Sequence, residues 1–288
     1  MKLLKQFILP LLVVCGCSGC SEDERDSYSD GEKMVEVNGT QLKFKVTSVS
    51  TATLMQDDSY KDLAFPDSCI TIPAKVKIDD WNYTVNKIDD IAFRNCTQLK
   101  KVIIPSSVTS IGICAFFNCS NLKDVKLPTN VEHLGESIFG SCTSLDSIVL
   151  PTNIKKLPNQ TFMNCKNLKN VVIPEGVTEI ENNAFQECSS LTEVKIPESV
   201  TIIGQNAFSF CSALTSINIP SKVTSIESYA FHGCSALTNV EIPSSVTVIG
   251  EHAFSSCENI DVVIDNSEDN VKVNLAAFIN VKSVTWKK

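Results

Sequence analysis

The chain is 288 residues long, is 43% hydrophobic and carries a formal net charge of −8 at pH 7. This hydrophobic content is enough for a continuous core. The excess of acidic residues argues against nucleic acid as the main partner, because phosphate binding needs clustered Lys and Arg side chains.

The first 20 residues predict an export signal. Lys2 and Lys5 form a short basic region, and the apolar stretch Phe7 to Val14 follows it. This stretch is too short to span a bilayer, and small residues come after it. We therefore assign residues 1–19 to a signal peptide.

The segment Cys15-Gly16-Cys17-Ser18-Gly19-Cys20 resembles the end of a bacterial lipoprotein signal, in which a Cys preceded by a small residue is lipidated. Cys20 is the expected site because Ser21-Glu22-Asp23-Glu24 follows it. That acidic run resembles the signal that sends some lipoproteins of Gram-negative bacteria to the outer face of the outer membrane. Cys17 is the alternative site because Val14 lies three places before it, and a cleaved secretory signal without lipid is a third interpretation. We expect an exported protein, anchored to the outer membrane by lipid and facing outward.

Residues 20–33 are expected to form a disordered acidic tether, because they contain almost no apolar side chains. Residues 34–88 are predicted to form a strand-rich N-terminal cap and an irregular first coil. Apolar residues alternate with polar ones there, and Asn38-Gly39 favours a hairpin turn. Pro73 lies 32 residues before Pro105, so we expect a 9-residue insertion in this first coil, around Asp79 to Asn82.

From Ala92 to Ile260 the chain repeats a unit of 23 residues. A Phe and a Cys three places later mark each copy, and a Leu three places after the Cys and a later Pro mark all but the last, in which Ile260 takes the place of the Leu. The Phe column is Phe93, Phe116, Phe139, Phe162, Phe185, Phe208, Phe231 and Phe254, and the Cys column is Cys96, Cys119, Cys142, Cys165, Cys188, Cys211, Cys234 and Cys257. A fixed period in this range predicts a solenoid, in which each coil buries its apolar face against its neighbours. We assign residues 89–264 to the solenoid and residues 265–288, where the pattern decays, to a C-terminal cap.

Spacing within one copy predicts the path of each coil. Val194 and Ile196 alternate with a polar residue, which predicts a strand that Pro197 ends. A bend and a short second strand or extended edge follow. Phe208 and Cys211 then share one face of a short helical turn.

The unit Leu-x-x-Val-x-Ile-Pro-x-x-Val-Thr-x-Ile-Gly-x-x-Ala-Phe-x-x-Cys is clearest at Leu191 to Cys211 and Leu237 to Cys257. It closely resembles the leucine-rich repeats of the BspA-like family of bacterial surface proteins. The resemblance implies a β-rich α/β solenoid, a right-handed superhelix of about eight coils with a parallel sheet on one face and short helical turns. Family members are commonly surface or secreted proteins, and some are adhesins for host extracellular-matrix proteins or for other cells. The resemblance does not identify the ligand of this chain, because the residues of the repeat consensus lie in the core and do not contact a partner.

The Cys column is expected to be a buried, reduced ladder. One thiol per coil spreads the ligands along an axis, whereas a metal site needs them at one point. Disulfides between neighbouring coils are the alternative, although parallel Cβ vectors suit stacking better than bridging. Cys69 and Cys114 lie outside the ladder, and Cys114 is expected to be accessible.

Catalytic constellations and cofactor motifs are absent from the sequence. His133, His232 and His252 occupy three different columns of the repeat, so we expect them to project from different parts of the coil. No phosphate-binding loop, nucleophile elbow or paired-Cys zinc signature occurs. We therefore expect no enzyme activity, no metal and no cofactor.

A binding site is expected where the repeat varies on a rigid backbone. Two outward columns flank the strand Val, and aliphatic and basic residues gather in their N-terminal half. The candidate partner-binding residues are Lys101, Ile103, Lys126, Val149, Val172 and Lys195. The competing interpretation is that Ile and Val only suit a strand.

Two functions remain open from the sequence. The favoured one is a surface-anchored, non-enzymatic, adhesin-like protein whose sheet face recognises a protein or glycan partner, such as a host matrix or cell-surface protein. The alternative is a structural or self-associating protein of the cell envelope. Neither involves nucleic acid, and the membrane enters only through the lipid anchor.

Overall fold

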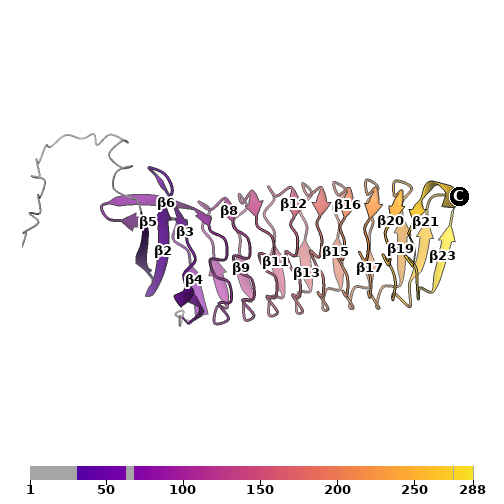
Figure 1. The fold of residues 1–288 in the computed structure, drawn as a ribbon, viewed down its shortest axis with the longest axis horizontal. Coiled ribbons are helices and arrows are strands. Elements are labelled where there is room, and N and C mark those ends of the chain that lie inside the picture. Colours follow the sequence, from indigo (N-terminus) through magenta and orange to yellow (C-terminus); the bar gives the residue numbers. More distant parts are fainter. Residues whose placement is uncertain (1–30, 63–67, 275, 288) are drawn as a thin grey trace, which may run out of the picture.

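The computed structural model describes residues 31–62, 68–274 and 276–287. These residues form a solenoid of about nine turns that is built from short strands, with almost no helix (Figure 1). The expected signal peptide and both candidate lipidation residues, Cys17 and Cys20, lie outside the described residues. Within the described part of the chain, no helix is long and apolar enough to cross a bilayer.

The N-terminal end of the solenoid is covered by antiparallel strands. Strands β1 (Glu32–Val37) and β2 (Thr40–Val46) form a hairpin, and β3 (Thr51–Leu54) pairs with β2 on its other side. Asn38 and Gly39 have φ values of 49° and 79°, which these two residue types tolerate well. The predicted hairpin turn at these residues is thus confirmed.

The insertion in the first coil is a second hairpin. Strands β5 (Lys75–Ile78) and β6 (Trp81–Ile88) pair in antiparallel fashion around Asp79, whose φ is 53°. β6 also pairs in parallel with β3 and with the next coil, and it thereby joins the N-terminal strands to the solenoid. The extra residues are accommodated outside the stack of coils.

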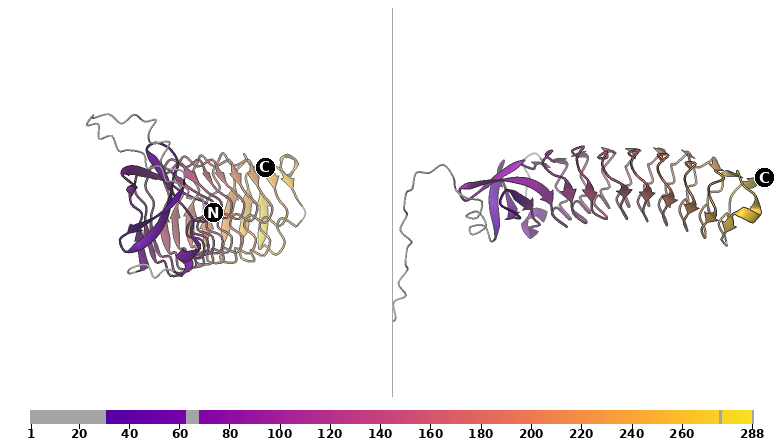
Figure 2. Two further views of the ribbon diagram at one scale, coloured as in Figure 1. Left: turned by 60° about the vertical axis from the view of Figure 1, so that its left-hand side comes forward. Right: turned by 90° about the horizontal axis from the view of Figure 1, so that it is seen from above.

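Each regular coil supplies one strand to each of two parallel sheets. Sheet 1 contains the strands in which the repeat places its Val-x-Ile pattern, and the second short strands form sheet 2. Sheet 1 comprises β4 (Cys69–Thr71), β7 (Lys101–Ile103), β9 (Asp124–Lys126), β11 (Ser147–Val149), β13 (Asn170–Val172), β15 (Glu193–Lys195), β17 (Ser216–Ile217), β19 (Asn239–Ile242), β21 (Asp261–Ile264) and β23 (Ser283–Trp286). Sheet 2 comprises β8 (Ser110–Ile111), β10 (His133–Leu134), β12 (Lys156–Leu157), β14 (Glu179–Ile180), β16 (Ile202–Ile203), β18 (Ser225–Ile226), β20 (Val248–Ile249) and β22 (Lys272–Val273). Figure 2 shows these coils stacked along one axis.

The third side of each coil is a turn, although a short helical turn was expected. Each of these turns has a residue with positive φ near either end, for example Asn206 at 54° and Phe210 at 58°. A left-handed residue ends a right-handed helix, so the three residues between them cannot extend into one. The helical elements among the described residues are two 3-10 turns, η1 (Asp58–Lys61) and η3 (Glu268–Asn270).

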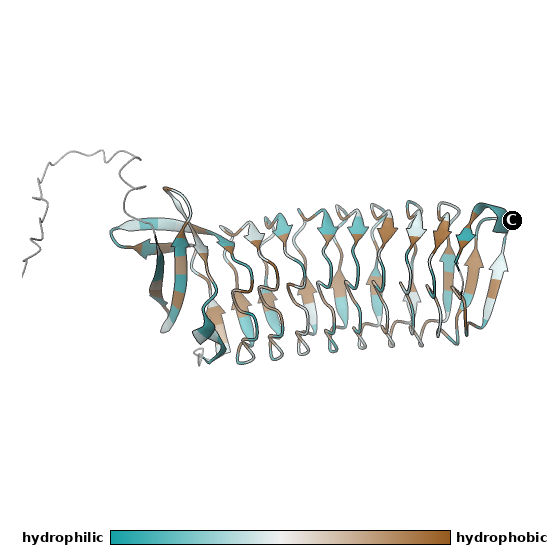
Figure 3. Ribbon diagram, in the orientation of Figure 1, coloured by the Kyte–Doolittle hydropathy of each residue, from teal (hydrophilic) through white to brown (hydrophobic). Residues whose placement is uncertain are grey.

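The core is a stack of identical side chains. Phe rings of successive coils lie face to face with centroids 5.1 to 5.8 Å apart. Tyr60 from η1 begins the stack against Phe93, and Phe278 of the last coil ends it against Phe254. Strands alternate hydrophobic residues, which face this core, with hydrophilic ones (Figure 3). The segment after Cys257 therefore continues the stack and both sheets by one more coil.

Candidate functional site

The six candidate partner-binding residues all lie in sheet 1, but the structure divides them into two groups. Ile103 and Lys126 are neighbours in the pairing of β7 with β9. Val149, Val172 and Lys195 are neighbours in the pairing of β11, β13 and β15. Lys101 is engaged with Asp124, whose carboxylate lies 2.6 Å from its Nζ atom.

Val149 and Val172 are the most exposed large apolar residues in the described part of the chain. Their side chains are 75% and 70% exposed, whereas the Val or Ile residues at the centres of the same strands are buried. Because β11 and β13 are paired in register, the two valines lie side by side on adjacent coils. They form the most exposed apolar pair on this sheet face.

Sheet 1 is interrupted immediately beside this pair. β9 pairs with β7 and β11 pairs with β13, but β9 and β11 are not hydrogen-bonded to each other. Sheet 2 is interrupted at the same level, because β10 pairs only with β8 and β12 only with β14. We call the boundary between residues 123–135 and residues 146–158 the open junction. No other boundary between described coils interrupts both sheets.

Pro158 gives a local reason for the gap in sheet 2. At the equivalent position of other coils a backbone N–H donates to the preceding coil, as Glu181 does to the Leu157 carbonyl at 2.9 Å and Gly135 does to the Ile111 carbonyl at 2.8 Å. Pro158 has no N–H and cannot donate to the carbonyl of Leu134. Leu134 is also only half-buried, although the equivalent residues of neighbouring coils are buried.

The turn side stays closed across the open junction. The N–H groups of Ser137, Phe139 and Ser141 donate to carbonyls of the next coil at 2.7 to 3.0 Å. The Phe139 and Phe162 rings stack at 5.8 Å, at the upper end of the range for the stack. The two coils are therefore joined through their turns and core while both sheets are parted.

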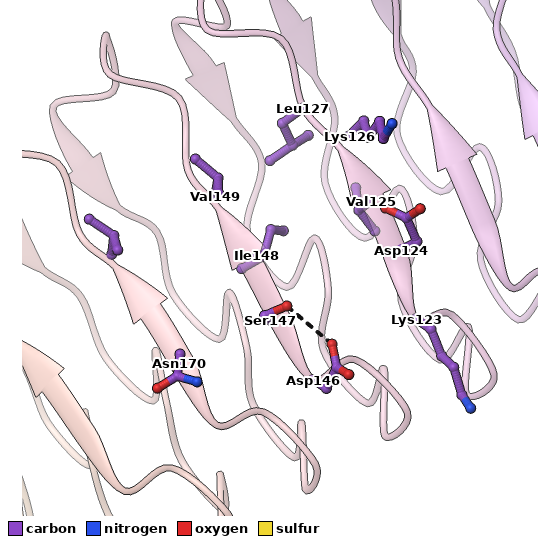
Figure 4. A pocket seen from close by; sticks show the side chains of 11 residues that line it. Lys123, Asp124, Val125, Lys126, Leu127, Asp146, Ser147, Ile148, Val149 and Asn170 are labelled. Carbon is purple, nitrogen blue, oxygen red and sulfur yellow. Dashed lines mark hydrogen bonds between the residues drawn. The ribbon is translucent and has the colours of Figure 1, made fainter.

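Each interrupted sheet carries a groove. The first groove, of about 780 Å³, lies over β9 and β11 (Figure 4). Its apolar lining includes Leu127, Val149 and Val172, and Lys123 and Asp146 contribute charges of both signs. A second groove of about 360 Å³ lies over β10 and β12 and is lined by His133, Leu134 and Pro158 among others. A shallow groove with an apolar lining and a few charges suits contact with another macromolecule.

The Cys column forms a buried ladder, and each thiol has a hydrogen-bond partner. Cys165 donates to the Phe139 carbonyl with an Sγ to O distance of 3.1 Å, and Cys211 donates to the Phe185 carbonyl at 3.2 Å. Burial raises the pKa of the Cys165 thiol to about 12. A thiol that stays protonated is a poor nucleophile, which favours a structural role for Cys165. Cys69 and Cys114, outside the ladder, are half-buried.

The expectation that the histidines project from separate parts of the coil is wrong for two of them. His232 and His252 both contact the Tyr229 ring, with centroids 5.6 and 4.9 Å away. They come from different columns of the repeat, but neighbouring coils bring those columns together. Phe210 packs edge-on against His232 at 5.0 Å. In the part of the chain that the structure describes, no group of three or more His, Cys, Asp or Glu side chains is arranged to hold a metal ion.

Comparison with known proteins identifies the repeat. The sequence matches the BspA type leucine rich repeat region in six copies, over residues 75–192 and 155–285. A leucine-rich repeat protein from Bacteroides ovatus is 27% identical, and the match covers 86% of this chain and 70% of that chain with a TM-score of 0.70. One from Eubacterium ventriosum is 21% identical over 85% of this chain and 82% of that chain, with a TM-score of 0.49. One from Bacteroides capillosus is 31% identical over 48% of this chain and 96% of that chain, with a TM-score of 0.40. No curated protein matches the sequence. The chain thus belongs to the family of BspA-type leucine-rich repeat proteins.

Proposed function

We propose that this protein is a surface-anchored, non-enzymatic recognition protein that binds a protein partner through sheet 1. The contact is centred on Val149 and Val172 beside the first groove. Leucine-rich repeat proteins commonly mediate protein binding, and the fold is typically a scaffold without enzymatic activity. The observation that carries the proposal is the exposure of these two neighbouring valines on a sheet face.

Strand propensity alone does not explain the two valines. Lys126 and Lys195 occupy the same position of the repeat, and each also lies in a paired strand of sheet 1. The backbone can therefore form this strand without an apolar residue at that position. Exposed apolar side chains next to a groove are typical of interfaces, because contact with a partner removes them from water.

Binding to purified matrix proteins tests this proposal. The purified protein is immobilised and titrated with collagen, fibronectin and laminin, and the same titrations are repeated with the double variant Val149→Glu, Val172→Glu. We expect one of these ligands to bind and the double variant to lose at least about tenfold in affinity, because two desolvated charges would replace apolar contacts.

A matched control adds the same two charges elsewhere on sheet 1. Ser216 and Asn239 are exposed residues of this sheet, so Ser216→Glu with Asn239→Glu should leave binding unchanged. If both double variants bind like the wild type, the valine pair is not the site. Protein that binds none of the three ligands but forms concentration-dependent oligomers in sedimentation experiments would favour the self-associating envelope protein instead.

Anchoring through a lipid on Cys20 is the second part of the proposal and depends on the sequence alone. We expect metabolic labelling with a fatty acid to mark the wild-type protein and the Cys17→Ala variant, but not the Cys20→Ala variant. Labelling that is lost only in Cys17→Ala would move the site to Cys17. Absence of label in all three forms would contradict lipidation.

A further inference from the structure

Four aromatic rings gather on the turn side of the solenoid, away from sheet 1. They come from three successive coils and are Phe210, Tyr229, His232 and His252, which we call the aromatic cluster. The Tyr229 and His252 rings stack at 4.9 Å, and His232 contacts both Tyr229 and Phe210 edge-on. The Nδ1 atom of His232 lies 2.7 Å from the Ser255 hydroxyl oxygen, which fixes the orientation of the imidazole. The cluster is therefore an ordered platform.

Phe210 is an unusual residue for its position. Its φ is 58°, a conformation that bulky residues avoid, and the equivalent positions of other coils carry Asn118, Asn164 and Ser256 among others. The ring is 48% exposed, so burial in the core does not explain it. Gly233 in the next coil leaves room for it, because a Cβ atom there would lie 2.8 Å from the Phe210 ring.

Tyr229 repeats the same pattern. Its φ is 60°, and the preceding coils place Asn183 and Asn206 at its position, with φ values of 57° and 54°. Asn adopts this conformation more readily than Tyr does. At both positions a large ring thus replaces residues that suit the backbone better, and the Phe210 ring is exposed while Tyr229 is half-buried.

Two carboxylates flank the cluster. Glu251 lies next to His252, with 3.6 Å between carboxylate oxygen and Nε2, and Glu187 occupies the position preceding Phe210 in the same column. Burial lowers the pKa of His232, so this imidazole is neutral at neutral pH. A cation is the ligand that such a surface complements.

The molecule already contains one contact of this kind. The Arg94 guanidinium lies over the Phe117 ring, 5.5 Å from its centroid, on the same turn side of the solenoid. Arg94 and Phe117 occupy equivalent positions in adjacent coils, so the coil spacing suits guanidinium stacking. Planar guanidinium groups stack on aromatic faces and pair with carboxylates, which ammonium groups do less well.

We propose that the aromatic cluster, together with the carboxylates of Glu187 and Glu251, binds arginine side chains of a basic polypeptide segment. This site is separate from sheet 1 and does not depend on the proposed function. Its ligand is defined by chemistry, namely a chain with accessible guanidinium groups. The rings supply stacking, and the two carboxylates supply the attraction.

Calorimetric titration of the purified protein with short synthetic peptides tests this. The probe peptide contains four Arg residues separated by Gly and Ser, and two others carry Lys or Glu instead of Arg. We expect the Arg peptide to bind, the Lys peptide to bind several-fold more weakly and the Glu peptide not to bind.

The informative variant is Phe210→Asn with Tyr229→Asn, because both substitutions introduce the residue that other coils use there. We expect its melting temperature to equal or exceed that of the wild type and its affinity for the Arg peptide to fall about tenfold, since two cation–π contacts are lost. The variant Val149→Thr with Val172→Thr, on sheet 1, should bind the peptide unchanged. A wild-type protein that does not bind the Arg peptide would overturn the proposal. So would a folded Asn variant that binds it as well as the wild type, because the attraction would then be general electrostatics.

Discussion

The open junction and the next boundary along the solenoid differ in how their coils are held. Between residues 146–158 and 169–181 both sheets are paired, through β11 with β13 and β12 with β14. Across the open junction neither sheet is paired, yet the Phe stack and the turn hydrogen bonds continue. The coils therefore keep their register without sheet pairing, which shows that the core and the turns are sufficient to hold it.

The largest expected effect comes from removing a ring at the open junction. Phe162→Ala deletes a buried ring that stacks on Phe139 across the parted sheets, and it should cost about 3 to 5 kcal/mol in the free energy of unfolding. Because neither sheet is paired there, the two ends of the rod should then unfold separately. Trp81 and Trp286 lie at opposite ends, so fluorescence of single-tryptophan variants in urea would follow each end.

Phe208→Ala is the matched control, because Phe208 stacks on rings across two boundaries at which both sheets are paired. We expect a similar loss of stability, but coincident transitions at both ends. Coincident transitions in Phe162→Ala as well would show that the open junction does not weaken the cooperativity of the rod.

A smaller effect is expected for the thiols. Cys165→Ala removes the hydrogen bond to the Phe139 carbonyl across the open junction and leaves a small cavity, at a cost of about 1 to 2 kcal/mol. Cys211→Ala removes the equivalent bond to Phe185 where the sheets are paired. In Cys165→Ala, hydrogen exchange should accelerate at the turn amides of Ser137, Phe139 and Ser141. In Cys211→Ala, exchange at the equivalent turn amides should accelerate less. Equal acceleration would mean that thiols contribute alike at both kinds of boundary.

The smallest expected effect is a repair of the open junction. Pro158→Glu restores an N–H at a position where Glu181 and Glu227 donate to the preceding coil at 2.9 and 3.0 Å. We expect a gain of about 1 kcal/mol in the free energy of unfolding, reduced by the greater freedom of the unfolded chain without proline. Amide exchange of β12 should slow. Unchanged exchange would show that Pro158 is not what parts sheet 2.

Much of the fold follows from the sequence because its causes are local and repeated. The spacing of Phe, Cys and Pro within one coil predicted the strand, its end and the buried side chains, and the turn at Asn38-Gly39 predicted the hairpin. The parted sheets were not predicted, because pairing depends on a donor in one coil and an acceptor in another. Pro158 stands at a position where other coils have Gly or Glu, and this difference is the signal in the sequence that could have indicated the gap in sheet 2.

The aromatic cluster was missed for a related reason. The repeat aligns residues within a column, and Tyr229 shares a column with His252 but not with His232 or Phe210. Coil stacking places side chains from adjacent columns against one another, which a comparison within columns does not show. A large ring at a position that other coils fill with Asn was the available signal.

The exact period also governs how such a molecule can change in length over generations. Core thiols bond to carbonyls 26 residues earlier, and strands pair with residues mostly 23 apart, so each coil offers its successor the same set of partners. A gene duplication or deletion of one whole unit leaves every remaining coil with an equivalent neighbour. A single inserted residue would instead move a Phe out of the stack. The hairpin of β5 and β6 shows the tolerated exception, since its extra residues loop out of the coil and leave the parallel pairing of β6 with β8 intact.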